Sequence, residues 1–170
     1  MKNIAVRYGM FAAGIFMAWT LMEHVLGLNT VHMAAGEKTR LASAFIFYMM
    51  IFICLRAKKK SSAEPFTYMD AIKTGALMVV IYSGITAVWL AIYQNLINPE
   101  MHTLMVQYTQ EKMIGLGASE EQMGQALNEV DMVYSGKPFA FIMYFVFSSI
   151  MGIFVTAIFG LLVRSKKASQ

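Results

Sequence analysis

Glu23 and His24 are the residues whose types and position most strongly suggest chemistry, because both are ionisable and both lie in the apolar stretch Tyr8–Leu28. An ionisable side chain inside a bilayer is costly, so it is by default a candidate functional site. A helix that starts near Tyr8 and rises about 1.5 Å per residue places Glu23 roughly 22 Å along a hydrocarbon layer of about 30 Å. Glu23 is therefore close enough to the outer interface to reach water.

Three interpretations of Glu23 follow from that depth. Its carboxyl can contact Arg40 or Lys38 at the outer end of the next apolar stretch, it can be protonated among the helices, or it can line a route for protons or cations. We favour the first, a structural tie between two helices. Successive helical residues point about 100° apart, so Glu23 and His24 are not expected to form one site. The candidate intramembrane polar site comprises Glu23, His24 and Arg40.

The sequence predicts no metal site, no cofactor and no catalytic residue. His32 and His102 are scattered without the spacing of metal ligands. The sixteen methionines are read as apolar filling, and the single cysteine, Cys54, excludes an intramolecular disulfide. There is no glycine-rich phosphate loop, zinc motif or nucleophile elbow, so we expect a protein that is not an enzyme.

Four long apolar stretches surround these residues and set the class of the protein. A helix needs roughly 20 apolar residues to cross a bilayer. The second stretch has only fifteen residues, but Arg40 and Arg56 at its ends can extend their guanidinium groups to the headgroups. The stretches are Tyr8–Leu28, Leu41–Leu55, Ala71–Ile97 and Phe139–Val163.

These stretches predict an all-α polytopic membrane protein with one four-helix transmembrane domain over residues 1–170. The spans are expected at about 8–28, 39–56, 69–97 and 138–163. Composition agrees, because 14% of the residues are charged, compared with about 25% in soluble domains. The composition thus argues against a soluble bundle, and the lipid bilayer is the first expected partner.

The basic residues predict the orientation. Ten of the fourteen lysines and arginines fall on one side of the spans, which places both termini and the middle loop in the cytoplasm and loops 29–38 and 98–137 in the periplasm. Lysines beside helix ends are explained by anionic lipid, and no nucleic-acid partner is expected. The ten are Lys2, Arg7, Arg56, Lys58, Lys59, Lys60, Lys73, Arg164, Lys166 and Lys167.

Residues 98–137 are predicted to form an external amphipathic helical hairpin between the third and fourth spans. Asn98 before Pro99 is a suitable N-cap, Gly115–Gly117 break the helix, and Ser119 with Gln122 forms a capping-box pattern. The two apolar stripes can pack on each other over the ends of the spans, or they can bind another protein. The stripes are Met101, Leu104, Met105 and Tyr108, and Met123, Ala126, Leu127, Val130 and Tyr134.

Several short segments, in their order and spacing, resemble the family called domain of unknown function 4199. They are Met1–Ile4 with Tyr8-Gly9, Phe66–Gly75, Ile97–Glu100, Gly117–Glu121 and Tyr134–Pro138. The resemblance implies a four-span inner-membrane protein of Bacteroidota bacteria with a helical external segment. It implies no activity.

Two functional hypotheses remain open. The first, which we favour, is a non-enzymatic membrane subunit or scaffold of an unspecified process that binds a membrane-protein partner, or a second copy of itself, through the external hairpin or the basic cytoplasmic loop. The second is a small transporter or channel component, coupled to protons or cations and acting as an oligomer, in which Glu23 with Tyr8, Tyr82 and Tyr93 lines a polar path.

Overall fold

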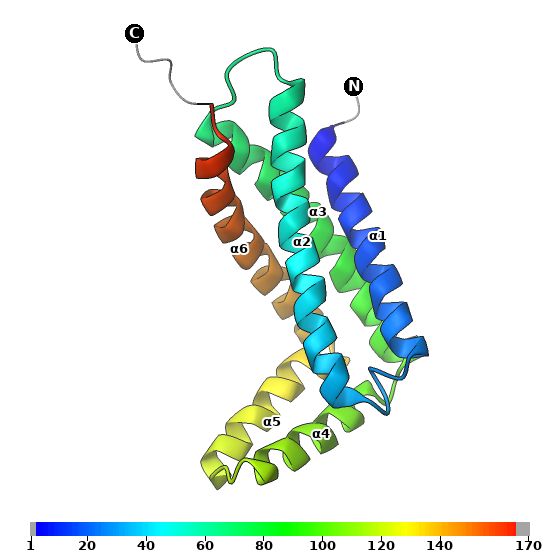
Figure 1. Ribbon diagram of the computed structural model, residues 1–170. Coiled ribbons are helices and arrows are strands. Elements are labelled where there is room, and N and C mark those ends of the chain that lie inside the picture. Colours follow the sequence, from blue (N-terminus) through cyan, green and yellow to red (C-terminus); the bar gives the residue numbers. More distant parts are fainter. Residues whose placement is uncertain (1–2, 166–170) are drawn as a thin grey trace.

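Four long helices lie side by side and form the body of the protein, in a computed structural model that describes residues 3–165 (Figure 1). They are α1 (Ile4–Val25), α2 (Met33–Ser61), α3 (Tyr68–Ile92) and α6 (Pro138–Val163). All regular structure in the described residues is helical. The start of α1, the end of α2, the start of α3 and the end of α6 lie at one end of this bundle (Figure 1).

Each of the four helices is long and apolar enough to cross a membrane, as predicted; the third reaches Ile97 because α3 continues into a short π-helical segment, η1 (Tyr93–Ile97). The second helix is longer than its apolar stretch, because it continues in both directions past Arg40 and Arg56, the two residues that flank that stretch. Large apolar side chains cover much of the outer surface of the bundle, such as Phe11, Phe147 and Phe154, each at least 60% exposed. A surface of this kind suits lipid contact.

Helix α3 is central, because it packs against α1, α2 and α6. Its contact with α6 is very close at Gly75, where an added Cβ would lie 2.2 Å from Cγ2 of Thr156. Close approach through small residues is the usual way in which helices associate in membranes. The core is completed by fully buried Ala13, Ile51 and Met78 from α1, α2 and α3.

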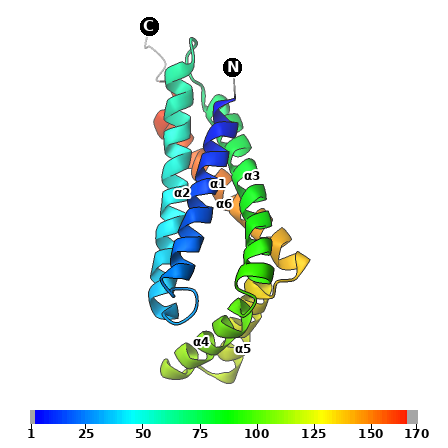
Figure 2. The ribbon, with the colours of Figure 1, turned by 90° about the vertical axis from the view of Figure 1, so that its right-hand side faces the viewer.

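Two shorter helices, α4 (Met101–Gly115) and α5 (Glu120–Tyr134), lie between η1 and α6 at the opposite end of the bundle (Figures 1 and 2). We call them the α4–α5 pair. They pack against each other, and Met105 and Val130 are buried together with Met33 of α2. The apolar stripes therefore face each other and the end of α2, which is the first of the two arrangements expected for them.

The predicted ends of these helices are partly right. Ser119 and Gln122 form the reciprocal capping box, with Gln122 N donating to Ser119 Oγ at 3.3 Å and Ser119 N donating to Gln122 Oε1 at 3.0 Å. The predicted N-cap at Asn98 is wrong, because α4 begins at Met101 with Glu100 in the capping position. The Asn98 side chain turns inward instead and is 4% exposed.

Candidate functional site

Glu23 is buried in the last turn of α1 and is 3% exposed. Its Oε1 accepts two hydrogen bonds, one from Trp19 Nε1 at 2.8 Å and one from Thr39 Oγ1 at 2.5 Å. Trp19 lies one turn earlier on the same helix, whereas Thr39 belongs to α2. A polar group that is buried among helices requires such partners, and Glu23 obtains them from both helices.

Asn29 connects Glu23 to Arg40 from the loop between α1 and α2. Its Nδ2 donates to Glu23 Oε2 over a long 3.5 Å, and its Oδ1 accepts from Arg40 Nη1 at 3.1 Å. The loop turns tightly at Gly27, which has a φ of +71°, and the Gly27 carbonyl accepts from the backbone N of residues 30, 31 and 32. Asn29 lies within this turn and is only 2% exposed.

The expected direct contact of Glu23 with Arg40 or Lys38 is wrong. Among residues 3–165 the ion pairs within 4.0 Å are His102 with Asp131 and Lys112 with Glu37. Thr39 lies between the two basic residues and points at Glu23, so Lys38 and Arg40 are each turned about 100° away from it on α2. The two helices are tied together by hydrogen bonds rather than by an ion pair.

His24 points to a different partner from Glu23. Its Nδ1 lies 3.2 Å from the hydroxyl of Tyr93 in η1, and the two rings are perpendicular. Asn98 then joins the two halves of the network, because its Nδ2 donates to the Asn29 carbonyl at 3.1 Å and to the Tyr93 hydroxyl at 3.4 Å. Glu23 and His24 thus face separate neighbours at the edges of one polar network.

The π-helical segment η1 directs two consecutive residues inward, Tyr93 and Gln94, which are 2% and 6% exposed. Short π-helical turns inside longer helices occur frequently at functional sites. Gln94 Nε2 donates to the Val133 carbonyl of α5 at 3.4 Å. Its Oε1 is buried without a hydrogen-bond partner, which is uncommon for a buried polar atom.

A cavity of about 440 Å³ adjoins this network in the half of the bundle nearest the α4–α5 pair. Residues from every helix line it. They include several charged or amide side chains and a set of aromatic side chains. The polar part includes Glu23, Asn29, Arg40 and Gln94. The aromatic part is formed by Phe16, Phe47, Tyr48, Tyr82, Tyr93, Tyr134, Tyr144 and Phe147. Cavities with mostly apolar walls and a few converging polar groups are typical ligand sites.

The remaining histidines lie apart from the cavity. His32 precedes the first residue of α2, and His102 Nε2 lies 2.6 Å from Asp131 Oδ1 on the surface of the α4–α5 pair. Across the described residues no three His, Cys, Asp or Glu side chains are placed to share a metal ion.

Four polar residues of the network were missed by the sequence interpretation of this site: Asn29, Thr39, Gln94 and Asn98 (considered only as a helix cap). Three of them, Asn29, Gln94 and Asn98, carried a local signal, as amides at the end of a long apolar run. Asn29 and Thr39 gain their roles from the turn at Gly27 and from the crossing of α1 with α2. Such tertiary contacts leave no periodic pattern in the sequence.

The fold and the site together define the class of protein. It is an all-helical bundle with four membrane-capable helices and a buried polar network beside a cavity at one end. The chain belongs to the family described as protein of unknown function (DUF4199), whose model matches residues 7–165, and the resemblance seen in the sequence is thereby confirmed. Comparison with curated proteins and with solved structures gives no match.

Proposed function

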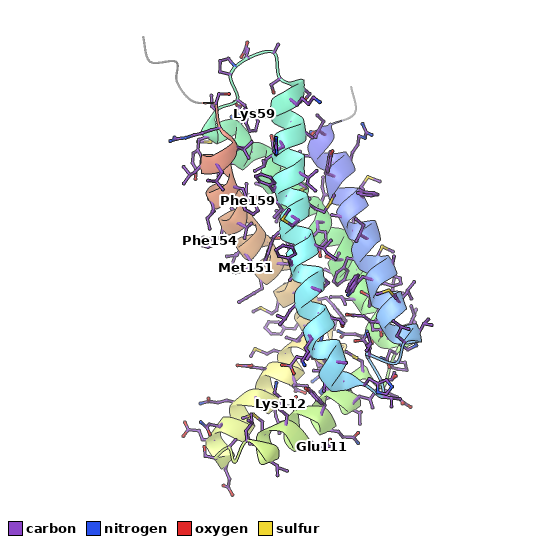
Figure 3. The ribbon with its side chains drawn as sticks, in the orientation of Figure 1. Lys59, Glu111, Lys112, Met151, Phe154 and Phe159 are labelled. Carbon is purple, nitrogen blue, oxygen red and sulfur yellow. The ribbon has the colours of Figure 1, made fainter. Side chains whose placement is uncertain are left out.

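We propose that this protein is a non-enzymatic, multi-pass subunit of the bacterial inner membrane that binds a membrane-protein partner through the α4–α5 pair. The orientation follows from charge: Lys59 lies at one end of the bundle, where the basic residues concentrate, and Glu111 and Lys112 lie at the other (Figure 3). The basic end is cytoplasmic by the positive-inside bias, so the α4–α5 pair lies in the periplasm.

The observation that carries this proposal is that polar and apolar contacts hold the pair against the end of α2. Glu37 of α2 accepts from the Tyr108 hydroxyl at 2.7 Å and from Lys112 Nζ at 2.7 and 2.9 Å. Met33, Met105 and Val130 add a buried apolar contact beside it. A flexible loop would need neither, whereas a surface that is held in place loses less entropy when it binds.

The far end of the pair offers a surface of distinct chemistry. Ile114 and Leu116 are 69% and 71% exposed beside the turn at Gly117. Glu111, Glu120 and Glu121 lie within a few residues of them along the chain and are exposed as well. An apolar patch with an acidic border fits a partner that presents apolar residues among lysines and arginines.

The transporter hypothesis has less support in the bundle. Between the cavity and the end of α2 that carries Lys59, the interior is closed by fully buried Ala13, Ile51, Met78 and Val79. A polar route through one chain would have to open this apolar packing. The lead proposal requires no such change.

Site-specific photo-crosslinking in the native membrane tests the proposal. A crosslinking residue at Leu116 is expected to capture one membrane protein in stoichiometric yield, and Glu120→Lys with Glu121→Lys is expected to reduce that yield. Leu162 is the matched control, because it is also 71% exposed but lies on the apolar outer face of α6. Capture of lipid alone at both positions would contradict the proposal. So would a crosslinking yield at Leu116 that is unchanged by the two lysine substitutions. Capture of a second copy of the chain alone would show that this surface forms a homo-oligomer and does not bind a different membrane protein.

A further inference from the structure

The partner-binding proposal does not involve the cavity beside Arg40. Its volume of about 440 Å³ lies within the range of roughly 300–1,000 Å³ that is usual for small-molecule sites. Its polar residues gather at the end towards the α4–α5 pair, and its aromatic residues extend towards the middle of the bundle. A ligand that fits both parts has a polar head and an apolar body.

Arg40 supplies the first requirement on the polar head. A guanidinium has five N–H donors. Here one donates to Asn29 Oδ1 at 3.1 Å, and another meets only the thioether sulfur of Met105 at 3.9 Å, which is a weak acceptor. Arg40 is half-buried and has no carboxylate within 4.0 Å among the described residues. A phosphate or carboxylate on the ligand would provide the missing acceptor.

Gln94 supplies the second requirement. Its amide nitrogen is held by the Val133 carbonyl, and its Oε1 is left buried without a donor. An unpaired buried acceptor is costly, and a ligand N–H or O–H group removes that cost. The head group therefore needs a donor as well as an anionic group.

Charge balance selects among head groups of this kind. Glu23 and Arg40 are the two charged residues of the lining, so its formal net charge is zero. The Glu23 carboxyl already accepts from Trp19, Thr39 and Asn29. A zwitterionic head group, with a phosphate for Arg40 and an ammonium for Gln94 Oε1, matches both the charge and the unused hydrogen-bonding groups.

The cavity is open towards the apolar surface of the bundle. Phe147 and Met151 of α6 line it and are also 67% and 39% exposed. Met151 lies midway along α6, on the part of the surface that the proposed membrane covers (Figure 3). A lipid can therefore place its head group in the cavity while its acyl chains leave through this opening.

We propose that the cavity binds a phospholipid whose head group carries a phosphate and a primary ammonium, as in phosphatidylethanolamine. The phosphate contacts Arg40, the ammonium donates to Gln94, and the first part of the acyl chains lies against Phe47 and Phe147. The site is separate from the exposed end of the α4–α5 pair, so it can be tested independently of the partner.

Native mass spectrometry of the full-length chain in detergent, after delipidation, tests this site. Titration with phosphatidylethanolamine is expected to give one tightly held lipid per chain. Phosphatidylcholine has the same phosphate but no N–H donor, and we expect it to bind about tenfold more weakly, which corresponds to the loss of one charged hydrogen bond. Equal binding of the two lipids would overturn the assignment.

Variants locate the binding. Arg40→Gln is expected to weaken both lipids about tenfold or more, and Gln94→Leu is expected to remove the preference for phosphatidylethanolamine. Arg56→Gln, at the other end of α2, is the matched control and should leave binding unchanged.

If Arg40→Gln fails to fold, Ala44→Phe, which fills the cavity from its wall, still tests the site. Binding that survives Ala44→Phe would place the lipid on the outer surface and contradict the proposal. If inorganic phosphate binds as tightly as phosphatidylethanolamine and its binding also requires Arg40, the site would be assigned to a free anion, which would contradict the proposal.

Discussion

Thr39 Oγ1 donates a hydrogen bond of 2.5 Å to Oε1 of Glu23 and so joins the last turn of α1 to the second turn of α2. The same hydroxyl also lies 3.0 Å from the Gly36 carbonyl of its own helix. Glu23 is buried, so the loss of this donor cannot be made up by bulk water. This contact ties together the ends of α1 and α2 that lie next to the α4–α5 pair.

We predict that Thr39→Val destabilises the protein by about 1–3 kcal/mol, because it keeps the size of the side chain and leaves a buried oxygen with one donor fewer. Thr39→Ser retains the hydroxyl and is expected to reduce the free energy of unfolding much less. Unfolding of both variants in mixed detergent, followed by circular dichroism, measures the difference. If Thr39→Val unfolds like the unchanged protein, the hydrogen bond is not a significant tie.

Glu23→Gln separates a structural role from a transport role. A glutamine oxygen still accepts from Trp19 and Thr39, so we expect the variant to fold and to keep its crosslinking yield from Leu116. Proton or cation flux in liposomes is the second measurement. A flux in the unchanged protein that disappears in Glu23→Gln would favour the transporter hypothesis over ours.

The close contact of α3 with α6 predicts a sharp difference between two glycines. Gly75→Ala would bring its Cβ to 2.2 Å from Thr156 Cγ2, so the helices must move apart, at a cost of about 1–3 kcal/mol. At Gly84 an added Cβ would lie 3.9 Å from the nearest atom, on Phe145, and Gly84→Ala is expected to be tolerated. Thermal unfolding in detergent compares the two. Equal melting temperatures would show that the interface adjusts freely.

Alkaline pH is predicted to weaken the attachment of α4 to α2. The hydrogen bond with Glu37 raises the pKa of Lys112 above its ordinary value of 10.5 and that of Tyr108 above 10.0. Because both values are raised in the folded protein, the stabilisation is fully present below the ordinary values and is lost as the pH rises through the raised ones. The effect stays below about 1 kcal/mol, since Lys112 and Glu37 are nearly half exposed.

The melting temperature at about pH 9 and about pH 11.5 measures this loss. Glu37→Gln is the control, because it lacks the carboxylate that shifts both groups and should show a smaller difference between the two pH values. An equal difference in the variant would mean that other groups cause the alkaline destabilisation.

The helices of the bundle could be predicted because long apolar runs specify them without reference to other parts of the chain. The capping box at Ser119 and the helix break at Gly115–Gly117 were equally local and are confirmed. The helix start at Asn98 was predicted wrongly, since the sequence does not show that this amide is needed to bridge Asn29 and Tyr93.

The polar site could be predicted only in part. Glu23 was identified because a buried acid is costly wherever it lies, but its partner was expected to be a base. Thr39 lies between Lys38 and Arg40, and only the rotation of α2 relative to α1 decides which of these three side chains faces Glu23. The unpaired Oε1 of Gln94 is likewise a consequence of η1, for which the apolar run gives no signal.

Labelling of single cysteines with a membrane-impermeant thiol reagent tests the central claim, that the helices span the membrane and the α4–α5 pair lies outside. The native Cys54 is fully buried and therefore out of reach of the reagent, so it should give little background. We predict that Leu116→Cys is labelled in intact spheroplasts, whereas Lys59→Cys is labelled only after the membrane is opened. Labelling of Lys59→Cys in intact spheroplasts, with Leu116→Cys protected, would contradict the account.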